Sequence, residues 1–221
     1  MADGSRFDLA GSAQASVLHR ISENFLPLDA SMEGRGVHAQ AFLKGETFPA
    51  AYVEFDLLET RPGCRCNDKD FIAACDAVND TLGSLADALI QSSVEDIGAV
   101  LARGPILHLS RLEVRSHHAG RGLGAAFGGQ MVSRLVQLHR ASLLVIKPFP
   151  LQFESCAPPA GSASSEAFSS AFNEAEAKLT EFYRLNFGAQ RAGEGKAYLL
   201  APLGGLKLLV DEFGWSLSTK N

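Results

Sequence analysis

The strongest fold signal in the chain is the stretch Leu112-Glu113-Val114-Arg115-Ser116-His117-His118-Ala119-Gly120-Arg121-Gly122-Leu123-Gly124, which has the pattern of a strand, a glycine-rich turn and the start of a helix. Glycines let the backbone of such a turn approach a ligand closely. Unpaired N–H groups and the positive dipole end of the following helix favour an anion such as a phosphate. The stretch therefore predicts an anion-binding turn, although a Gly-x-Gly-x-Gly pattern is weak evidence without its context.

The elements predicted on both sides of the turn supply that context. Residues 106–115 have the pattern of a strand, and residues 142–147 form a short apolar run typical of a buried strand. The helix between them begins at Leu123 and is indicated by four apolar residues at helical spacing, Phe127, Met131, Leu135 and Leu138. A β-α-β unit therefore frames the glycine turn.

The residues around the turn resemble the central signature of the GNAT superfamily of N-acetyltransferases. That signature is Leu-x-Val, a short polar stretch, and then Gln/Arg-x-x-Gly-x-Gly/Ala; here Leu112-Glu113-Val114 is followed by Ala119 to Gly124 at the expected distance. Ala119 stands where the family has Gln or Arg. Because backbone N–H groups do most of the binding in such a loop, we expect weaker pyrophosphate binding and not its loss. A second register, Arg121-x-x-Gly124-x-Ala126, also fits but lies two residues further into the helix, so the first is preferred.

The resemblance implies a fold class and a cosubstrate. The fold is an α/β (α+β) arrangement with a mixed, mostly antiparallel central sheet flanked by helices, built around the β-α-β unit. Acetyl-CoA would lie along the strand that ends at Val114, with its pantetheine paired to the backbone of Leu112 and Val114. A strand N–H would stabilise the oxyanion that forms when an amine attacks the thioester. The remaining cofactor-binding residues would be those of the turn: Ala119, Gly120, Arg121, Gly122, Leu123 and Gly124.

The resemblance also points to a general acid. The segment Phe182-Tyr183-Arg184-Leu185-Asn186-Phe187-Gly188 is similar to the family's aromatic pair followed by Gly-Phe, with Asn186 in place of the glycine and a spacing one residue shorter. In the family, the tyrosine that matches Tyr183 protonates the departing thiolate, which is a role within the reach of a phenol. The alternative is that Tyr183 is an aromatic residue that packs the end of a helix onto the sheet.

A general base is also expected, because the attacking amine must lose a proton. His108 lies four residues before Leu112, where several family members place a carboxylate base, and an imidazole titrates in the useful range. The alternative is a buried core histidine. Glu113 is the third candidate catalytic residue and is expected on the opposite face of the strand. Glu54 and Asp56, on a neighbouring predicted strand, could bind a cationic acceptor.

Metal and redox sites are not expected. His117 and His118 could contact phosphates, but adjacent residues in a strand point in alternating directions and make a poor pair of metal ligands. Cys64 and Cys66 fit an ordinary loop better than a metal or redox site. The four cysteines form no disulfide framework, so we expect reduced thiols.

Length and composition predict a single compact domain. The 221 residues, 46% of them hydrophobic, can bury one substantial core. We divide the chain into an N-terminal helical extension over residues 1–34 and an acetyltransferase domain over residues 35–221. The chain has no candidate membrane span or signal peptide, so a cytoplasmic location is expected. The net charge of −5 gives no support to nucleic-acid binding.

The rest of the chain is assigned from periodicity and turn residues. Helices are predicted over residues 14–25, 68–91, 95–101 and 166–184, with the second starting at a cap at Asn67 or Asp68. A hairpin is predicted from strands over 37–43 and 48–58 joined at Lys44-Gly45-Glu46, and closing strands over 196–202 and 206–213. The apolar final segment from Phe213 to Leu217 is a candidate homodimer interface.

The leading hypothesis is an acyl-CoA-dependent N-acyltransferase. It would transfer acetyl from acetyl-CoA to a primary amine by direct attack in a ternary complex, without a metal, and the acceptor would be a small-molecule or peptide amine. The alternative is a non-catalytic CoA-binding or protein-interaction module on the same fold. A dinucleotide or nucleoside-triphosphate enzyme fits less well, because the chain has no Gly-Lys-Ser/Thr motif.

Overall fold

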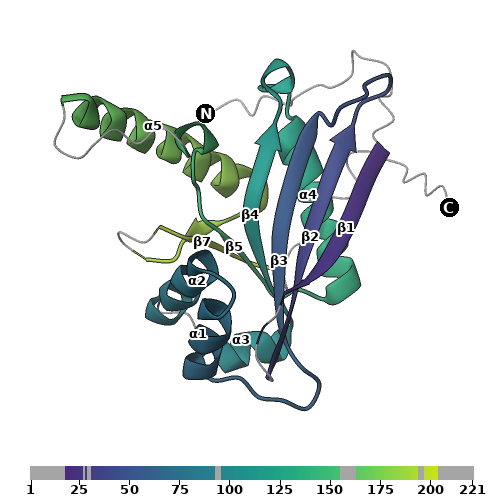
Figure 1. Cartoon of the computed structure of the whole chain (residues 1–221), viewed down its shortest axis with the longest axis vertical. Coiled ribbons are helices and arrows are strands. Elements are labelled where there is room, and N and C mark those ends of the chain that lie inside the picture. The colour runs from purple at the N-terminus through teal and green to yellow at the C-terminus, as the bar shows by residue number, and fades with distance from the viewer. Residues whose placement is uncertain are drawn as a thin grey trace, which may run out of the picture.

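A computed structural model describes residues 18–26, 28, 31–92, 96–154, 163–193 and 197–203. Within them, a seven-stranded sheet has the order β1-β2-β3-β4-β5-β7-β6 (Figure 1). The strands are β1 Leu18–Leu26, β2 Met32–Phe42, β3 Ala51–Thr60, β4 Ile106–Val114, β5 Leu143–Ile146, β6 Gln190–Arg191 and β7 Leu199–Pro202. Strands β4 and β5 are parallel and the other neighbours are antiparallel, which confirms the expected mixed, mostly antiparallel sheet.

Helices cover the two faces of the sheet unequally. They are α1 Asp68–Asp76, α2 Asp80–Gln91, α3 Ile97–Arg103, α4 Leu123–His139 and α5 Ala163–Phe187. In Figure 1, α4 lies behind the sheet, and α1, α2 and α3 lie below its other face, while α5 extends to the side of β4. The upper part of the face opposite α4 is therefore left without a covering helix in the described chain.

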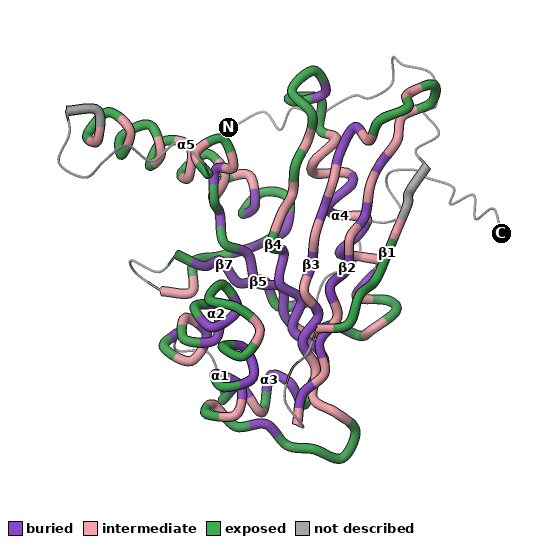
Figure 2. The backbone as a smooth tube through the Cα atoms, in the orientation of Figure 1, coloured by how far each residue is buried: buried purple, intermediate pink, exposed green. Residues whose placement is uncertain are grey.

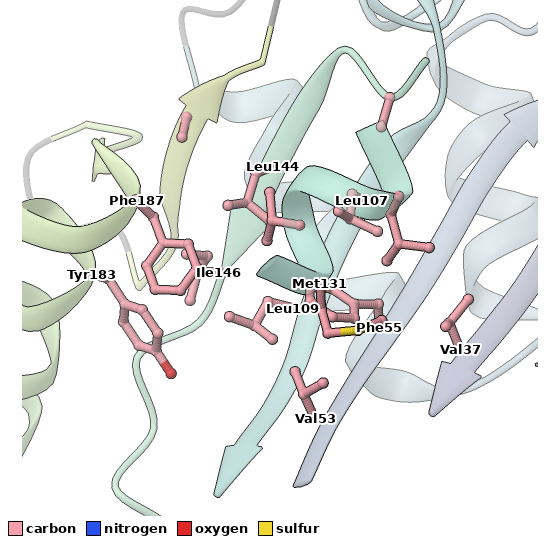
Figure 3. Close-up of a cluster of buried hydrophobic side chains, with 14 of the residues drawn as sticks. Val37, Val53, Phe55, Leu107, Leu109, Met131, Leu144, Ile146, Tyr183 and Phe187 are labelled. Carbon is pink, nitrogen blue, oxygen red and sulfur yellow. The ribbon is translucent and has the colours of Figure 1, made fainter. Parts of the chain in front are cut away.

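Each covered face has its own apolar core. The core under α4 joins the helix residue Met131 to sheet residues such as Phe55 and Leu109, and Figure 3 shows these side chains meeting between helix and sheet. The second core packs Phe71 and Leu85 of α1 and α2 against the lower end of the sheet. Figure 2 shows the result: buried and more exposed positions alternate along much of β2 and β3, whereas the start of β4 and all of β5 are buried. Burial of these side chains stabilises each helix against the sheet, since each contributes about 1.5–3 kcal/mol when fully buried.

A β-bulge in β4 changes which side chains share a face. Phe55 pairs with Leu109, but Glu54 pairs with Arg111, so Ser110 is an extra residue with no counterpart on β3. Beyond the bulge, the side chains of β4 that alternate between the two faces of the sheet are shifted by one residue relative to those before it. Glu113 therefore lies on the same face as His108, and the expectation that it lies on the opposite face is wrong.

Strands β4 and β5 separate shortly after they begin to pair. Their parallel register runs from Ile106 and Leu143 to Leu109 and Ile146, where β5 ends, whereas β4 continues to Val114. Past Leu109, the edge of β4 that faced β5 has no strand partner among the described residues. Main-chain groups on this edge are available to a ligand, because every N–H and C=O of a strand needs a hydrogen-bond partner.

The predicted N-terminal helix is wrong for its described residues. Residues 18–25 belong to strand β1, which pairs with β2 from Leu18 and Phe42 to Leu26 and Gly34. The apolar residues of the segment have the spacing of one face of a helix. Phe25 is 60% exposed, however, so these residues do not form one buried face. Pairing with β2 decides the conformation instead. Residues 14–17 lie outside the described part, and the division at residue 34 stays a prediction.

The predicted helix over residues 68–91 is also wrong in its length. It is two helices, because Asn79 accepts a hydrogen bond from the Leu82 N–H and starts α2 after α1 has ended at Asp76. The capping role expected at Asn67 is confirmed, since its side chain accepts from the N–H groups of Lys69 and Asp70.

The remaining assignments are mostly confirmed. The hairpin of β2 and β3, the β4-α4-β5 unit and a helix in the 166–184 region are present, although α5 is longer than predicted and Leu138 is exposed. Strand β6 was not predicted, and the strand expected over 206–213 lies outside the described residues.

Cys64, Cys66 and Cys75 are free thiols. None of the described helices has the length and apolar character needed to cross a bilayer.

Candidate active site

A cleft of about 770 Å³ lies where β4 leaves β5. Its walls come from β3, β4, the segment after β5 and the C-terminal half of α5, with Thr81 of α2 also at its edge. Six candidate residues named from the sequence line it: Glu54, His108, Leu112, Glu113, Val114 and Tyr183. The structure therefore brings together the three candidate catalytic side chains and the strand segment expected to pair with pantetheine.

His108 is held by a carboxylate at the cleft. Its Nδ1 lies 2.9 Å from Oδ2 of Asp56, and the histidine is only 1% exposed. An ionised carboxylate can only accept a hydrogen bond, so Nδ1 carries the proton and the lone pair of the neutral ring is on Nε2. The arrangement orients an imidazole that can accept a proton at Nε2 and stabilises the imidazolium that results.

Tyr183 approaches the cleft from α5. Figure 3 shows Tyr183 and Phe187 extending from α5 toward Ile146 of β5 and Leu109 of β4. The Tyr183 ring packs against Phe182 and Phe187 at centroid distances of 5.2 and 5.8 Å. Burial raises the pKa of Tyr183 to about 12, so the phenol is protonated at neutral pH. The residue both packs the end of the helix and places a hydroxyl donor at the cleft.

Glu113 occupies the outer wall of the cleft. Its Oε2 accepts a hydrogen bond from Nε of Arg111 at 3.3 Å, and Nη2 of Arg111 donates to Glu154 at 3.2 Å. The Glu113 side chain is 53% exposed. Arg111 thus links β4 to the segment that follows β5, and Glu113 fits a role in this wall better than that of a buried base.

The glycine turn adopts the backbone conformation expected of an anion loop. Gly120 and Gly122 both have φ of 75°, and a Cβ on either would meet open space. Gly122 is the N-cap of α4 and, as a glycine, has no side chain with which to cap the helix. Gly124 serves packing instead, since a Cβ there would lie 3.2 Å from Val114. The first N–H groups of α4 thus have no side-chain cap that a bound anion would need to displace.

The turn lies beside the cleft and does not line it. Ala119, Gly120, Arg121 and Gly122 are exposed, and the Leu123 side chain packs against the core under α4. Val114 is the last residue of β4 and lines the cleft, so the chain passes directly from the cleft wall into the turn. A ligand that occupied both would have to be long and to carry its anionic group at one end.

The expectation that His117 and His118 diverge is wrong. They lie in a 3₁₀ turn, η1 Ser116–His118, and their ring centroids are 3.9 Å apart. The alternation that separates neighbouring side chains holds for strands, and β4 ends at Val114 before these residues.

A second polar group extends from the cleft across the open face of the sheet. Tyr52 donates a short hydrogen bond to Glu54, His38 Nδ1 lies 3.0 Å from the Tyr52 hydroxyl, and Glu54 also lines the cleft. Burial and the adjacent Glu54 raise the pKa of Tyr52 to about 12. Sequence reasoning named Glu54, as a residue that could bind a cationic acceptor, but missed its hydrogen bond to Tyr52, the contact with His38 and the Arg111 link. The alternating polar residues Tyr52, Glu54 and Asp56 on β3 were the available signal.

Comparison of the chain with models of protein families, with curated proteins and with solved structures gave no match.

The buried phenols give a prediction about alkaline pH. All three tyrosines, Tyr52, Tyr183 and Tyr198, have pKa values raised by burial above the ordinary value of about 10. Native protein should therefore show little tyrosinate absorbance at pH 10. Because the unfolded chain loses these protons first, the free energy of unfolding should fall as the pH rises from about 10 to about 12. Denaturant titrations of wild type and Tyr183→Phe check this, and the variant should show a shallower fall. Ionisation of the tyrosines near pH 10 in folded protein would contradict their burial.

Proposed function

We propose that the protein is an acyl-CoA-dependent N-acyltransferase that transfers acetyl from acetyl-CoA to a primary amine by direct attack in a ternary complex. One observation carries the proposal: the parallel strands β4 and β5 separate after Leu109, and the freed edge of β4 runs along a cleft into a glycine turn at the start of α4. The other residues that match the GNAT superfamily signature lie along this edge of β4 or in the glycine turn.

The strand edge and the turn fit different parts of the cosubstrate. Pantetheine carries amide groups, which would pair with main-chain groups of Leu112 and Val114 as another strand would. The pyrophosphate would bind at the N–H groups of the turn and of the first turn of α4, where the helix dipole is favourable. Arg121, exposed in the turn, would add a charge contact. The thioester would then lie inside the cleft, near His108 and Tyr183.

His108 and Asp56 would serve the attacking amine. Nε2 of His108 takes the proton from the ammonium or from the nitrogen as it attacks, and the Asp56 carboxylate stabilises the imidazolium. The nitrogen forms a bond to the thioester carbon, and the C–S bond then breaks to give the amide and the CoA thiolate. A positioned base of this kind contributes about 10²–10⁴-fold in rate. An N–H on the open edge of β4 would stabilise the oxyanion between these two steps.

Tyr183 would stabilise the departing sulfur by a hydrogen bond. Burial raises the pKa of Tyr183 to about 12, so the phenol holds its proton more firmly than an exposed tyrosine does. The hydroxyl therefore acts best as a donor to the developing charge, with the thiolate protonated by solvent after release. This refines the proton-donor role that the family resemblance implies.

A panel of amines with acetyl-CoA separates this function from a non-catalytic CoA-binding module. Free thiol release and product masses are measured together, so hydrolysis of the thioester is distinguished from transfer to the amine. Binding of CoA without any acetylated product would favour the module, and the absence of CoA binding would contradict both.

Tyr183→Phe should lower kcat by about 10²-fold while leaving the Kd for CoA nearly unchanged, because only the hydrogen bond to the departing sulfur is lost. Tyr198→Phe is the matched control. Tyr198 is also buried, but it packs in the core under α1 and α2 and does not line the cleft. Steady-state kinetics with an accepted amine check the prediction, and a Tyr183→Phe enzyme as fast as the control would remove Tyr183 from the mechanism.

Gly122→Val should weaken CoA binding by at least about tenfold, because a β-branched residue is strained at a φ of 75° and would cover the N–H groups of the turn. Gly129→Val is the control, since Gly129 lies in α4 and a Cβ there also meets open space. Calorimetry with CoA and a thermal melt of each variant check the prediction. Equal affinities for the two folded variants would show that the turn is not the phosphate site.

A further inference from the structure

We propose that Glu46, His117 and His118 form a binding site for a divalent transition-metal ion, with Zn²⁺ as the best match. One ligand atom from each of the three side chains can be chosen so that all lie within 4.8 Å of one another. The residues come from two separate turns: Glu46 from the turn between β2 and β3, and the histidines from η1 after β4. The proposal is independent of the acyltransferase function.

The geometry already approaches that of a coordinated ion. Nε2 of His118 lies 2.9 Å from Oε1 of Glu46, and the two histidine rings are 3.9 Å apart. Ligands bound to Zn²⁺ at about 2.0–2.2 Å in a tetrahedron lie about 3.3–3.6 Å from one another. The present separations, 2.9 Å for the His118–Glu46 pair and at most 4.8 Å within the group, lie on either side of this range. His117 is exposed, so its ring can rotate without displacing packed neighbours.

The backbone that carries the ligands is held in place. The N–H of His118 donates to Arg115 at 2.8 Å, and the N–H of Arg115 donates to Ala50 at 3.0 Å, which fixes η1 against the start of β3. The N–H of Glu46 donates to Leu43 at 3.0 Å within its own turn. The Arg115 guanidinium lies 5.0 Å above the centre of the Phe48 ring. A site built on such fixed turns loses little conformational entropy when it binds an ion.

The ligand types select the class of metal. Two imidazoles and one carboxylate are the protein ligands of several zinc sites, in which a fourth position is open to water or to another ligand. Imidazole suits Zn²⁺, Cu²⁺ and Ni²⁺, whereas Ca²⁺ and Mg²⁺ prefer oxygen ligands. His118 is 6% exposed and Glu46 is half-buried, so the ion would be partly shielded from solvent. A bound ion would cross-link the β2–β3 turn to the segment that leads into the glycines at 120 and 122.

Competition with a zinc-binding dye, followed by calorimetry, tests the site on the full chain. Wild type should bind one Zn²⁺ per chain, and Co²⁺ in its place should give the absorption bands of a tetrahedral or five-coordinate ion. His117→Ala and Glu46→Gln should each lower the affinity by at least about tenfold, since loss of even an outer-shell partner costs about 10–100-fold. His117→Ala removes an exposed side chain, and Glu46→Gln keeps an acceptor for His118, so both variants should fold.

Two controls separate this site from adventitious binding. His38→Gln removes a histidine on the open face of the sheet, and Cys64→Ser removes an exposed thiol; neither should change the affinity. Wild type that fails to bind Zn²⁺ would overturn the proposal. Equal affinities for wild type, His117→Ala and Glu46→Gln would also overturn it, as would a loss of affinity in either control variant.

Discussion

The arrangement of the candidate site depends on how briefly β4 pairs with β5. The two parallel strands share a register of only four residue pairs, from Ile106 with Leu143 to Leu109 with Ile146. The bulge at Ser110 comes directly after the last pair and increases the local twist of β4. From that point, β4 is paired on one edge only within the described part of the chain, and the cleft lies beside its other edge. Had β5 been a few residues longer, the same main-chain groups would have been satisfied within the sheet.

The bulge also determines which side chains meet in the cleft. It places Arg111 and Glu113 on the face that carries His108, and it leaves Leu112 packed against the core under α4. The polar residues of β3 continue this face, so Asp56 reaches His108 and Glu54 reaches Tyr52. Burying an imidazole costs free energy unless its polar atoms are hydrogen-bonded, and the Asp56 carboxylate supplies that bond to His108. That bond offsets part of the cost of burial at Nδ1 and holds the imidazole beside the cleft.

Sequence reasoning predicted the centre of the molecule well and its periphery poorly. The β4-α4-β5 unit combines strong periodicity with a glycine turn, so local signals agree with the tertiary structure there. The helix expected over residues 14–25 failed in its described part, residues 18–25, because an edge strand needs little apolar alternation when its partner strand supplies the hydrogen bonds. The face of the sheet on which Glu113 lies could not be predicted. A bulge is determined by the pairing of two strands and leaves no clear signal in the sequence of either strand alone. The Asp56 partner of His108 and the proximity of Glu46 to the histidines are contacts over 52 and 72 residues, which no local pattern encodes.

Amide hydrogen exchange of the full chain with and without CoA tests the central claim most directly. If the open edge of β4 binds pantetheine and the turn binds the pyrophosphate, CoA should slow exchange in two short segments, Leu112 to Val114 and Leu123 to Ala125. Protection should not extend to the paired half of β4 from Ile106 to Leu109, which already has strand partners on both sides. Bound CoA that leaves both segments unprotected, or protects a distant surface instead, would contradict the account.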